Sequence, residues 1–105
     1  MLDRVRLEIE LLERHILVMK AVVAYQPIGI MKLSELLDLP FHRIRYSLRI
    51  LEQTGYIRAS QSGAIATPKT EEFLSSLEKD LNVLIELLES IREKRSENES
   101  SLKLA

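Results

Sequence analysis

The chain has 105 residues, with 15 lysines and arginines, 16 aspartates and glutamates, and a formal net charge of −1. This length predicts one domain with a real core, and the absence of cysteine excludes disulfides, cysteine nucleophiles and thiolate metal sites. No segment has the layout of a signal peptide or a membrane span, so we expect a cytoplasmic protein with no membrane partner.

The first predicted element is a long helix over residues 1–25, which Gln26-Pro27 ends. A heptad seam with steps of three and four runs along it and consists of Leu2, Val5, Ile9, Leu12, Ile16, Met19 and Val23. A second apolar stripe lies beside this seam and contains Leu7, Leu11, Val18 and Val22, in line with His15. Because one face is too narrow for both stripes, we expect one to pack on the domain itself and the other on a partner.

Residues 33–57 predict a helix, a tight turn, a second helix, a glycine stop and a strand, after a short strand at 28–31. The first of these helices begins near Lys32 or Ser34 and is expected to bury Leu33, Leu36 and Leu37. The turn is Asp38-Leu39-Pro40, and proline is tolerated in the first turn of the next helix because its missing N–H costs little there. The apolar face of that next helix is spaced 3, 4 and 3 residues apart and consists of Phe41, Ile44, Leu48 and Leu51.

A hairpin with strands at 56–59 and 64–66 follows, and Gly63 supplies the positive φ that its turn needs. The last helix spans 68–95, with Thr67 as N-cap and Pro68 at its first position. It carries a second heptad seam of Leu74, Leu77, Leu81, Leu84, Leu88 and Ile91. The polar tail at 96–105 is predicted to be disordered.

The spacing of the middle segment resembles the pattern of a known family at Glu35, Leu36, Leu37, Leu39-Pro40, Ile44, Leu48, Leu51-Glu52, Gly55, Tyr56 and Ile57. It is similar to winged helix-turn-helix DNA-binding proteins, especially bacterial and archaeal transcriptional regulators of the arsenical-resistance-repressor type. The resemblance implies a mainly α fold with a small β-hairpin wing, in which long N- and C-terminal helices form a dimer interface. The single winged helix domain then covers 1–95, divided into 1–25, 30–67 and 68–95. The cysteine and paired-histidine sensor ligands of that type are missing here, so metal sensing is not implied.

Charge is distributed unevenly along the chain. Residues 31–69 contain six basic and three acidic side chains, whereas residues 70–105 contain five basic and nine acidic ones. The positive charge therefore lies on the helix-turn-helix and its hairpin, where DNA phosphates would lie.

The second helix of the motif combines an apolar face with an arginine-rich face, which is typical of a DNA-reading helix. Arg45 and Arg49 are the best candidates for reading bases, since arginine makes bidentate pairs with guanine O6 and N7. Residues at the start of the preceding helix and in the wing are expected to contact the DNA backbone. The predicted DNA-binding set is Lys32, His42, Arg43, Arg45, Tyr46, Arg49, Arg58, Ser60 and Gln61.

The two heptad helices predict a homodimer. Its expected interface consists of Leu2, Val5, Ile9, Leu12, Leu77, Leu81, Leu84, Leu88 and Ile91. The leading hypothesis is a sequence-specific, double-stranded DNA-binding transcriptional regulator whose operator is an inverted repeat. The alternative is a winged-helix protein–protein interaction module in a transcription or other multi-subunit assembly. The sequence shows no catalytic constellation and no metal, cofactor or effector site, so we do not expect an enzyme.

Overall fold

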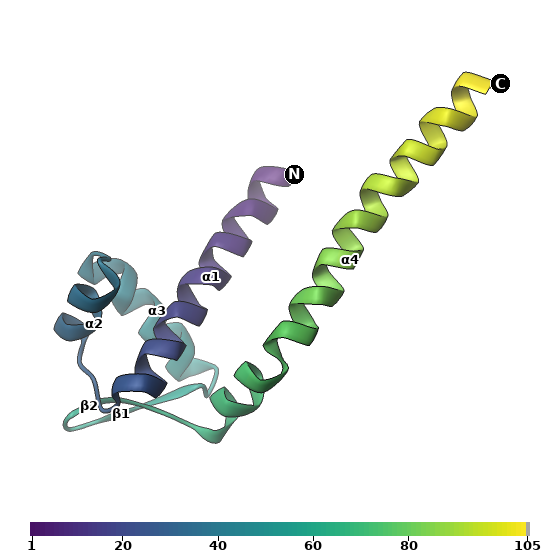
Figure 1. The fold of residues 1–105 in the computed structure, drawn as a ribbon. Helices are drawn as coiled ribbons and strands as arrows, with labels where there is room; N and C mark the ends of the chain where they lie inside the picture. Colours follow the sequence, from purple (N-terminus) through teal and green to yellow (C-terminus); the bar gives the residue numbers. More distant parts are fainter. Residues whose placement is uncertain (105) are drawn as a thin grey trace. The chain divides into compact units, whose positions relative to one another are not determined.

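The computed structural model describes the backbone of residues 1–104 and the side chains of residues 1–93. The chain is mainly helical with one antiparallel hairpin, which confirms the predicted fold class and fits a winged-helix-like architecture (Figure 1). In chain order the elements are α1 (Leu2–Tyr25), α2 (Ile30–Leu37), α3 (Phe41–Gln53), β1 (Ile57–Ser60), β2 (Gly63–Ala66) and α4 (Pro68–Leu104).

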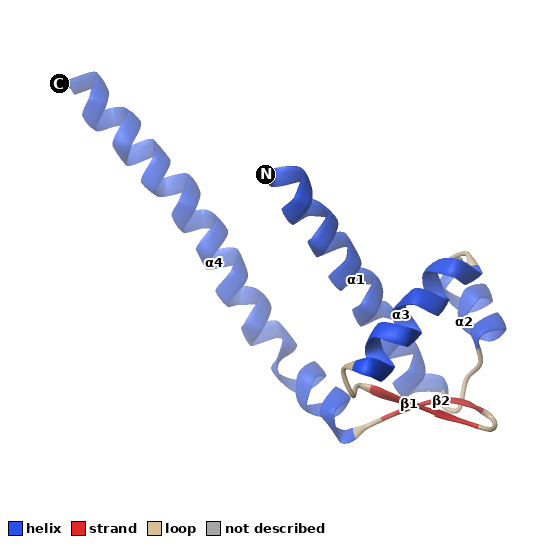
Figure 2. Cartoon of the chain, turned by 180° about the vertical axis from the view of Figure 1, so that it is seen from behind, coloured by secondary structure: helices blue, strands red, loops and turns tan. Residues whose placement is uncertain are grey.

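The chain divides into two compact units, and the boundary falls inside α4 between Glu72 and Phe73. The first unit, Met1–Glu72, holds α1, α2, α3, the hairpin and the first turn of α4. Figure 2 shows the two strands of the hairpin next to the C-terminal end of α1 and below α3. The second unit is the rest of α4.

The core of the first unit is aliphatic and draws on α1, α2, α3, both strands and the segment before α2. Helix α1 contributes through its C-terminal half, where Val18 and Val22 are completely buried. Leu33 of α2 and Ile44 of α3 are also completely buried. The remaining buried apolar residues are Met19, Ala21, Ile28, Leu51, Ile57 and Ala64.

The expectation that one apolar stripe of α1 packs on its own domain while the other stays free is met in part. Val18 and Val22 of the second stripe enter the core with Met19 of the heptad seam, whereas Leu2, Val5 and Ile9 are 79%, 43% and 50% exposed. At 1.5 Å per residue, the 24 residues of α1 are about 36 Å long and the 13 of α3 about 20 Å. The N-terminal half of α1 therefore extends beyond the elements that could cover it within this unit.

The helix-turn-helix is present, with several corrections to the predicted residues. Helix α2 begins at Ile30, before the predicted Lys32, and Pro40 is the N-cap of α3 rather than part of its first turn. Phe41 and Leu36 were predicted to be buried but are 48% and 42% exposed. Because α2 is only eight residues long, it inserts one fully buried residue into the core, and the start of α3 lies at the edge of that core.

The turn between α2 and α3 is closed by local hydrogen bonds. Asp38 adopts the left-handed conformation, with φ 52° and ψ 48°, and ends α2. The amide of Leu39 donates to the Ser34 carbonyl at 3.2 Å, and the Ser34 hydroxyl donates back to the Leu39 carbonyl. These bonds fix the angle at which α3 leaves the turn.

The wing is a hairpin with Gln61 and Ser62 at its tip and Ser60 paired with Gly63. The predicted strand at 28–31 is reduced to a single bridge between Ile28 and Ala64, because α2 already begins at Ile30. In this bridge the Ile28 amide donates to the Ala64 carbonyl at 3.2 Å, and the Ala64 amide donates to the Ile28 carbonyl at 2.7 Å. Gly63 has a φ of 131°, and this conformation brings the backbone of Ile28 close to its Cα.

Polar contacts join the start of α4 to the segment after α3. The Thr67 hydroxyl donates to the Gly55 carbonyl at 2.6 Å, and capping of α4 by this side chain stays a prediction. The Thr70 hydroxyl donates to the Tyr56 carbonyl at 2.5 Å, which satisfies a completely buried polar side chain.

Helix α4 continues to Leu104, whereas the sequence predicts its end at 95 and a disordered tail at 96–105. No proline or glycine follows Pro68, so the sequence contains no residue that would stop the helix. The side chains of 94–105 and the backbone of residue 105 lie outside the described residues. Among the helices that the structure describes, none is both long and apolar enough to cross a membrane.

Gly63→Ala is expected to destabilise the first unit strongly, because the new Cβ would lie 2.5 Å from the Ile28 carbonyl carbon at a φ of +131°. Backbone strain and overpacking together should cost about 2–4 kcal/mol. Gly29→Ala is the matched control, since nothing lies within 4 Å of its added Cβ. It should stay within about 1 kcal/mol of the wild type. Urea unfolding measures both, and equal losses would contradict the close approach at Gly63.

Candidate nucleic-acid interface

Helix α3 has one face in the core and an arginine-rich face in solvent. Ile44, Ser47 and Leu51 are buried, so the positions on the other side of the helix project outward. Five of the predicted DNA-binding residues lie on this outer side and line a cavity of about 460 Å³ with Arg14 of α1. These five are His42, Arg43, Arg45, Tyr46 and Arg49.

The Tyr46 ring is the centre of this surface. The guanidinium carbon of Arg49 lies 5.5 Å from the ring centroid, and that of Arg14 lies 5.9 Å from it. The His15 ring stacks on Tyr46 with 6.2 Å between centroids and 27° between planes. A cation over an exposed tyrosine ring contributes about 0.5–1 kcal/mol, so the two guanidiniums and the ring hold one another in place.

A buried hydroxyl links α1 to α3 beneath this ring. Ser47 is completely buried, its Oγ accepts a hydrogen bond from Nε of Arg14 at 3.2 Å, and it lies 2.9 Å from Nδ1 of His15. The arginine nitrogen can only donate, whereas the hydroxyl has two acceptor lone pairs and one hydrogen. The bond between Ser47 and His15 can therefore run in either direction, according to which ring nitrogen of His15 carries the proton.

The environment of His15 favours the neutral form of its ring. Burial of the ring lowers the pKa of His15 below its ordinary value of 6.5, and the positive charge of Arg14 lowers it further. Both causes disfavour the imidazolium form of the ring.

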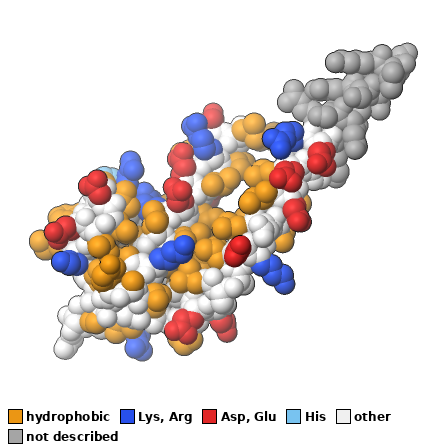
Figure 3. Space-filling model, in the orientation of Figure 1, with side chains coloured by type: hydrophobic (Ala, Val, Ile, Leu, Met, Phe, Trp, Pro, Cys, Tyr) orange, Lys and Arg blue, Asp and Glu red, His pale blue; other side chains and the backbone are white. Residues whose placement is uncertain are grey.

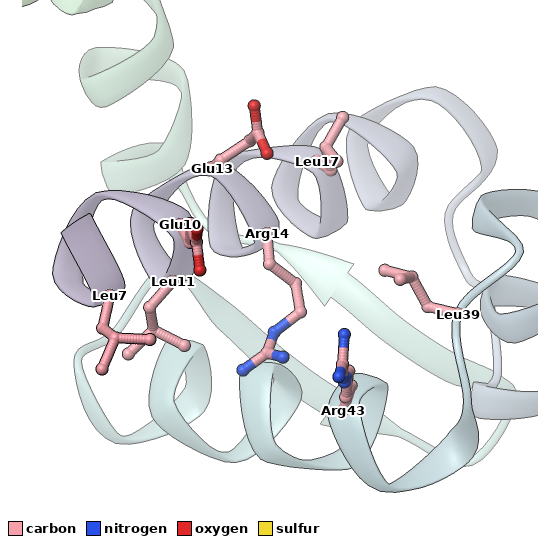
Figure 4. Close-up of a pocket in the computed structure, with 8 residues that line it drawn as sticks. All are labelled: Leu7, Glu10, Leu11, Glu13, Arg14, Leu17, Leu39 and Arg43. Atoms are coloured by element: carbon pink, nitrogen blue, oxygen red, sulfur yellow. The ribbon is translucent and has the colours of Figure 1, made fainter. Parts of the chain in front are cut away.

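A second cavity of about 610 Å³ lies between α1 and the start of α3, beside the first one. Figure 4 shows Arg14 reaching from α1 toward α3, and Arg43 reaching back from α3 toward α1. Leucines form much of its wall. Its lining residues are Leu7, Glu10, Leu11, Glu13, Arg14, Leu17, Leu39 and Arg43.

Among the described side chains, no carboxylate forms an ion pair with the arginines of the α3 cavity, although Glu10 and Glu13 line the neighbouring cavity with Arg14 and Arg43. Among the side chains of residues 1–93, ion pairs join Arg6 to Asp3 and to Glu10, each at 3.9 Å, and none involves an arginine of the α3 cavity. Four arginines line this cavity, two of them over the Tyr46 ring, and they produce a local positive potential on a chain whose net charge is −1.

The other predicted contact residues are exposed but lie outside this cavity. Lys32 lies on α2, and Arg58 and Gln61 lie on the wing. Ser60 already uses its hydroxyl in the wing turn, where it donates to the Gly63 carbonyl at 2.6 Å. The structure thus gathers the α3 residues into one surface and leaves the α2 and wing residues as separate exposed positions.

Arg14 belongs to this surface although the sequence did not identify it. Arg14 is one of several charged residues on α1, and its position in the helical repeat does not mark it as different from Glu13 or Arg6. Only its neighbour could have indicated its role: His15 lies in line with the second apolar stripe, which places the adjacent residue close to α3.

The predicted dimer residues are accessible in the chain. Leu81, Leu84, Leu88 and Ile91 are 36%, 49%, 53% and 67% exposed, and Leu12 and Leu77 are half-buried. Dimerisation through these residues stays a prediction.

Comparison with known proteins gives little further information. No family model matches the chain, and no curated protein matches it. A solved structure, the activation domain of the phage T4 transcription factor MotA, matches with a TM-score of 0.46 and 18% identity, over 64% of this chain and 78% of that chain. At this identity and TM-score the similarity says nothing about function.

The stability of the first unit is expected to depend on pH through His15. Because its pKa is lower in the folded chain than the ordinary value of 6.5, the unfolded chain binds more protons. The contribution of neutral His15 is therefore complete above the unfolded pKa and is lost as the pH falls through the folded pKa.

Urea unfolding between about pH 7.5 and pH 5.5 measures this dependence. The wild type should lose stability over this range, and His15→Gln should lose less, because glutamine keeps a hydrogen-bonding group without titrating. An identical pH dependence in the two proteins would show that His15 is not responsible.

Proposed function

We propose that this protein is a sequence-specific, double-stranded DNA-binding transcriptional regulator that acts as a homodimer, with α3 as its reading helix. The observation that carries the proposal is the group of four arginines that line the α3 cavity, none of them in an ion pair among the described side chains. Three of them come from the exposed face of α3, and such guanidiniums match the charge and the hydrogen-bonding groups of DNA.

The dimensions of α3 suit the major groove. A helix with its side chains is about 10–12 Å across, and the groove is about 12 Å wide. Arg45 and Arg49 lie four residues apart, one turn along the helix, so both can point toward base edges. We assign base reading to these two arginines and phosphate contacts to Arg43 and Arg14.

The wing and α2 would complete the footprint. Three exposed residues would take part: Arg58 on β1, Gln61 at the hairpin tip and Lys32 on α2. Among the side chains of residues 1–93, neither Arg58 nor Lys32 forms an ion pair. Contacts of this kind set the position of a protein on the duplex without reading sequence. The resemblance of residues 33–57 to arsenical-resistance-type regulators supports this arrangement, without their metal response.

The alternative, a protein–protein interaction module, is favoured by a different surface. From Leu81 onward, every described leucine of α4 is exposed. A cationic α3 and an apolar α4 serve different partners, so changes in one surface test one hypothesis without altering the other.

Arg45→Ala and Arg49→Ala should each weaken binding to the selected DNA site by about 5- to 150-fold and relax specificity at one base position. The site is first selected from a random duplex pool, where an inverted repeat is the expected product. Binding is then measured by fluorescence anisotropy. Arg4→Ala, which removes the same charge from an exposed position ten residues before Arg14, is the matched control and should change little.

Undetectable binding of the wild type even at low salt would contradict the proposal. If both arginine variants bound as the wild type does, while polar substitutions at Leu81 and Leu84 abolished function, the interaction module would be favoured.

Arg14→Ala should weaken binding to all duplexes alike and reduce the slope of log K against log[salt] by about 0.9, as expected for one lost phosphate contact. Arg14→Lys should keep most of that slope, since a lysine at this position still carries the charge. A change in base preference with an unchanged slope would instead mean that Arg14 acts only by positioning Tyr46.

A further inference from the structure

Helix α4 has an apolar face that extends over most of its described length. Leu84, Leu88 and Ile91 are 49%, 53% and 67% exposed, and Ile85 and Leu87 are 50% and 57% exposed. Figure 3 shows hydrophobic side chains following one another along this helix on the face in view. A stripe of this length in water indicates an interaction surface.

The spacing of this face is that of a coiled coil. The six residues from Leu74 to Ile91 step by 3, 4, 3, 4 and 3, which places leucine at all three a positions and leucine or isoleucine at all three d positions. Ile85 and Leu87 occupy the neighbouring e and g positions of the middle heptad and widen the seam at its centre. Between Leu74 and Ile91 the a and d positions include no polar residue that would favour a parallel register.

We propose that α4 pairs with α4 of a second copy of this chain in an antiparallel orientation. In an antiparallel pair each a position faces a d position of the other copy, and the spacing of this seam allows all of its positions to pair in this way. Leu81 meets Leu84, Leu77 meets Leu88, and Leu74 meets Ile91. All six apolar layers are filled without any residue outside the seam.

Charges along the flanks of the seam distinguish the two orientations. The e and g positions near the start of α4 are acidic, at Glu71, Glu78 and Asp80. The last e position of the described side chains is basic, at Arg92. The outward b and f positions carry the remaining charges, Glu72, Lys79, Glu86, Glu89 and Glu93.

In a parallel pair the acidic flanks of the two helices would adjoin each other, and each Arg92 would lie far from the acidic positions of the other copy. In the antiparallel pair the acidic start of one helix lies along the end of the other, and Glu71 comes beside Arg92 of the second copy. The helix dipoles also oppose each other in this orientation. Charge complementarity therefore selects the antiparallel pair.

Helix α1 is the competing surface. Leu2, Val5 and Ile9 are exposed, but the C-terminal half of α1 is already committed to the core of its own unit. Helix α4 has the longer uncommitted seam and is therefore the main site of self-association. This inference rests on the homodimer of the proposed function but not on DNA binding.

Engineered disulfides test the orientation directly, because the chain contains no cysteine. The full-length double variant Leu77→Cys, Leu88→Cys should form a covalent dimer on oxidation, whereas each single variant should not. In the antiparallel pair, identical positions lie 11 residues apart along the axis, about 16 Å. A disulfide needs Cα atoms within about 7 Å. Efficient cross-linking of either single variant would establish a parallel pair and overturn the proposal.

Sedimentation equilibrium tests whether α4 is the site of association. Leu84→Glu should shift the full-length chain from dimer to monomer at micromolar concentration, with unchanged helical content. Val83→Glu, at an exposed c position outside the seam, is the matched control and should remain dimeric. A monomeric wild type, or equal loss in both variants, would overturn the proposal. These measurements contain no DNA, so a failure of the DNA-binding hypothesis would leave their outcome unchanged.

Discussion

The hydroxyl of Ser47 is the constraint on which the cationic surface depends. A buried hydroxyl costs free energy unless it is hydrogen-bonded, and here both of its partners come from α1. This requirement fixes which turn of α1 faces α3 and where along α3 that turn lies. It also brings Arg14 to the side of α3, where its guanidinium lies over the Tyr46 ring. Core packing and the outer surface are thus joined through one polar atom.

Much of the fold could be predicted from the sequence because helical periodicity, turn residues and the glycine stop agree with one another. The residues that differ are those whose environment depends on a distant element. Ser47 is buried because α1 supplies its partners, and nothing in its neighbourhood in the sequence shows this. Phe41 is exposed because the short α2 leaves the start of α3 at the core edge, although the local pattern treats it as apolar interior.

The candidate site shows the same division. Five residues of α3 could be predicted because helix periodicity alone decides which of them share a face. The part that Arg14 plays in this surface could not be predicted, because it depends on how α1 packs against α3. The two residues that join these helices, Arg14 and Ser47, are 33 positions apart in the sequence. The dimer seam could be predicted as a pattern, and the structure adds that it is left exposed on α4 from Leu81 onward.

The contacts at the base of the wing have a consequence for the entropy of binding. The hairpin is held from the side by the segment that leads into α2, since Ile28 is bonded to Ala64 in both directions and the Ala66 amide donates to Oε1 of Gln26 at 2.8 Å. The wing and the helix-turn-helix are therefore ordered with respect to each other before any ligand arrives. Gln61 and Ser62 lie beyond the last strand pair, and there the Ser62 amide donates to Oγ of Ser60 at 3.3 Å. A surface preorganised in this way spends little of its interaction energy on ordering itself.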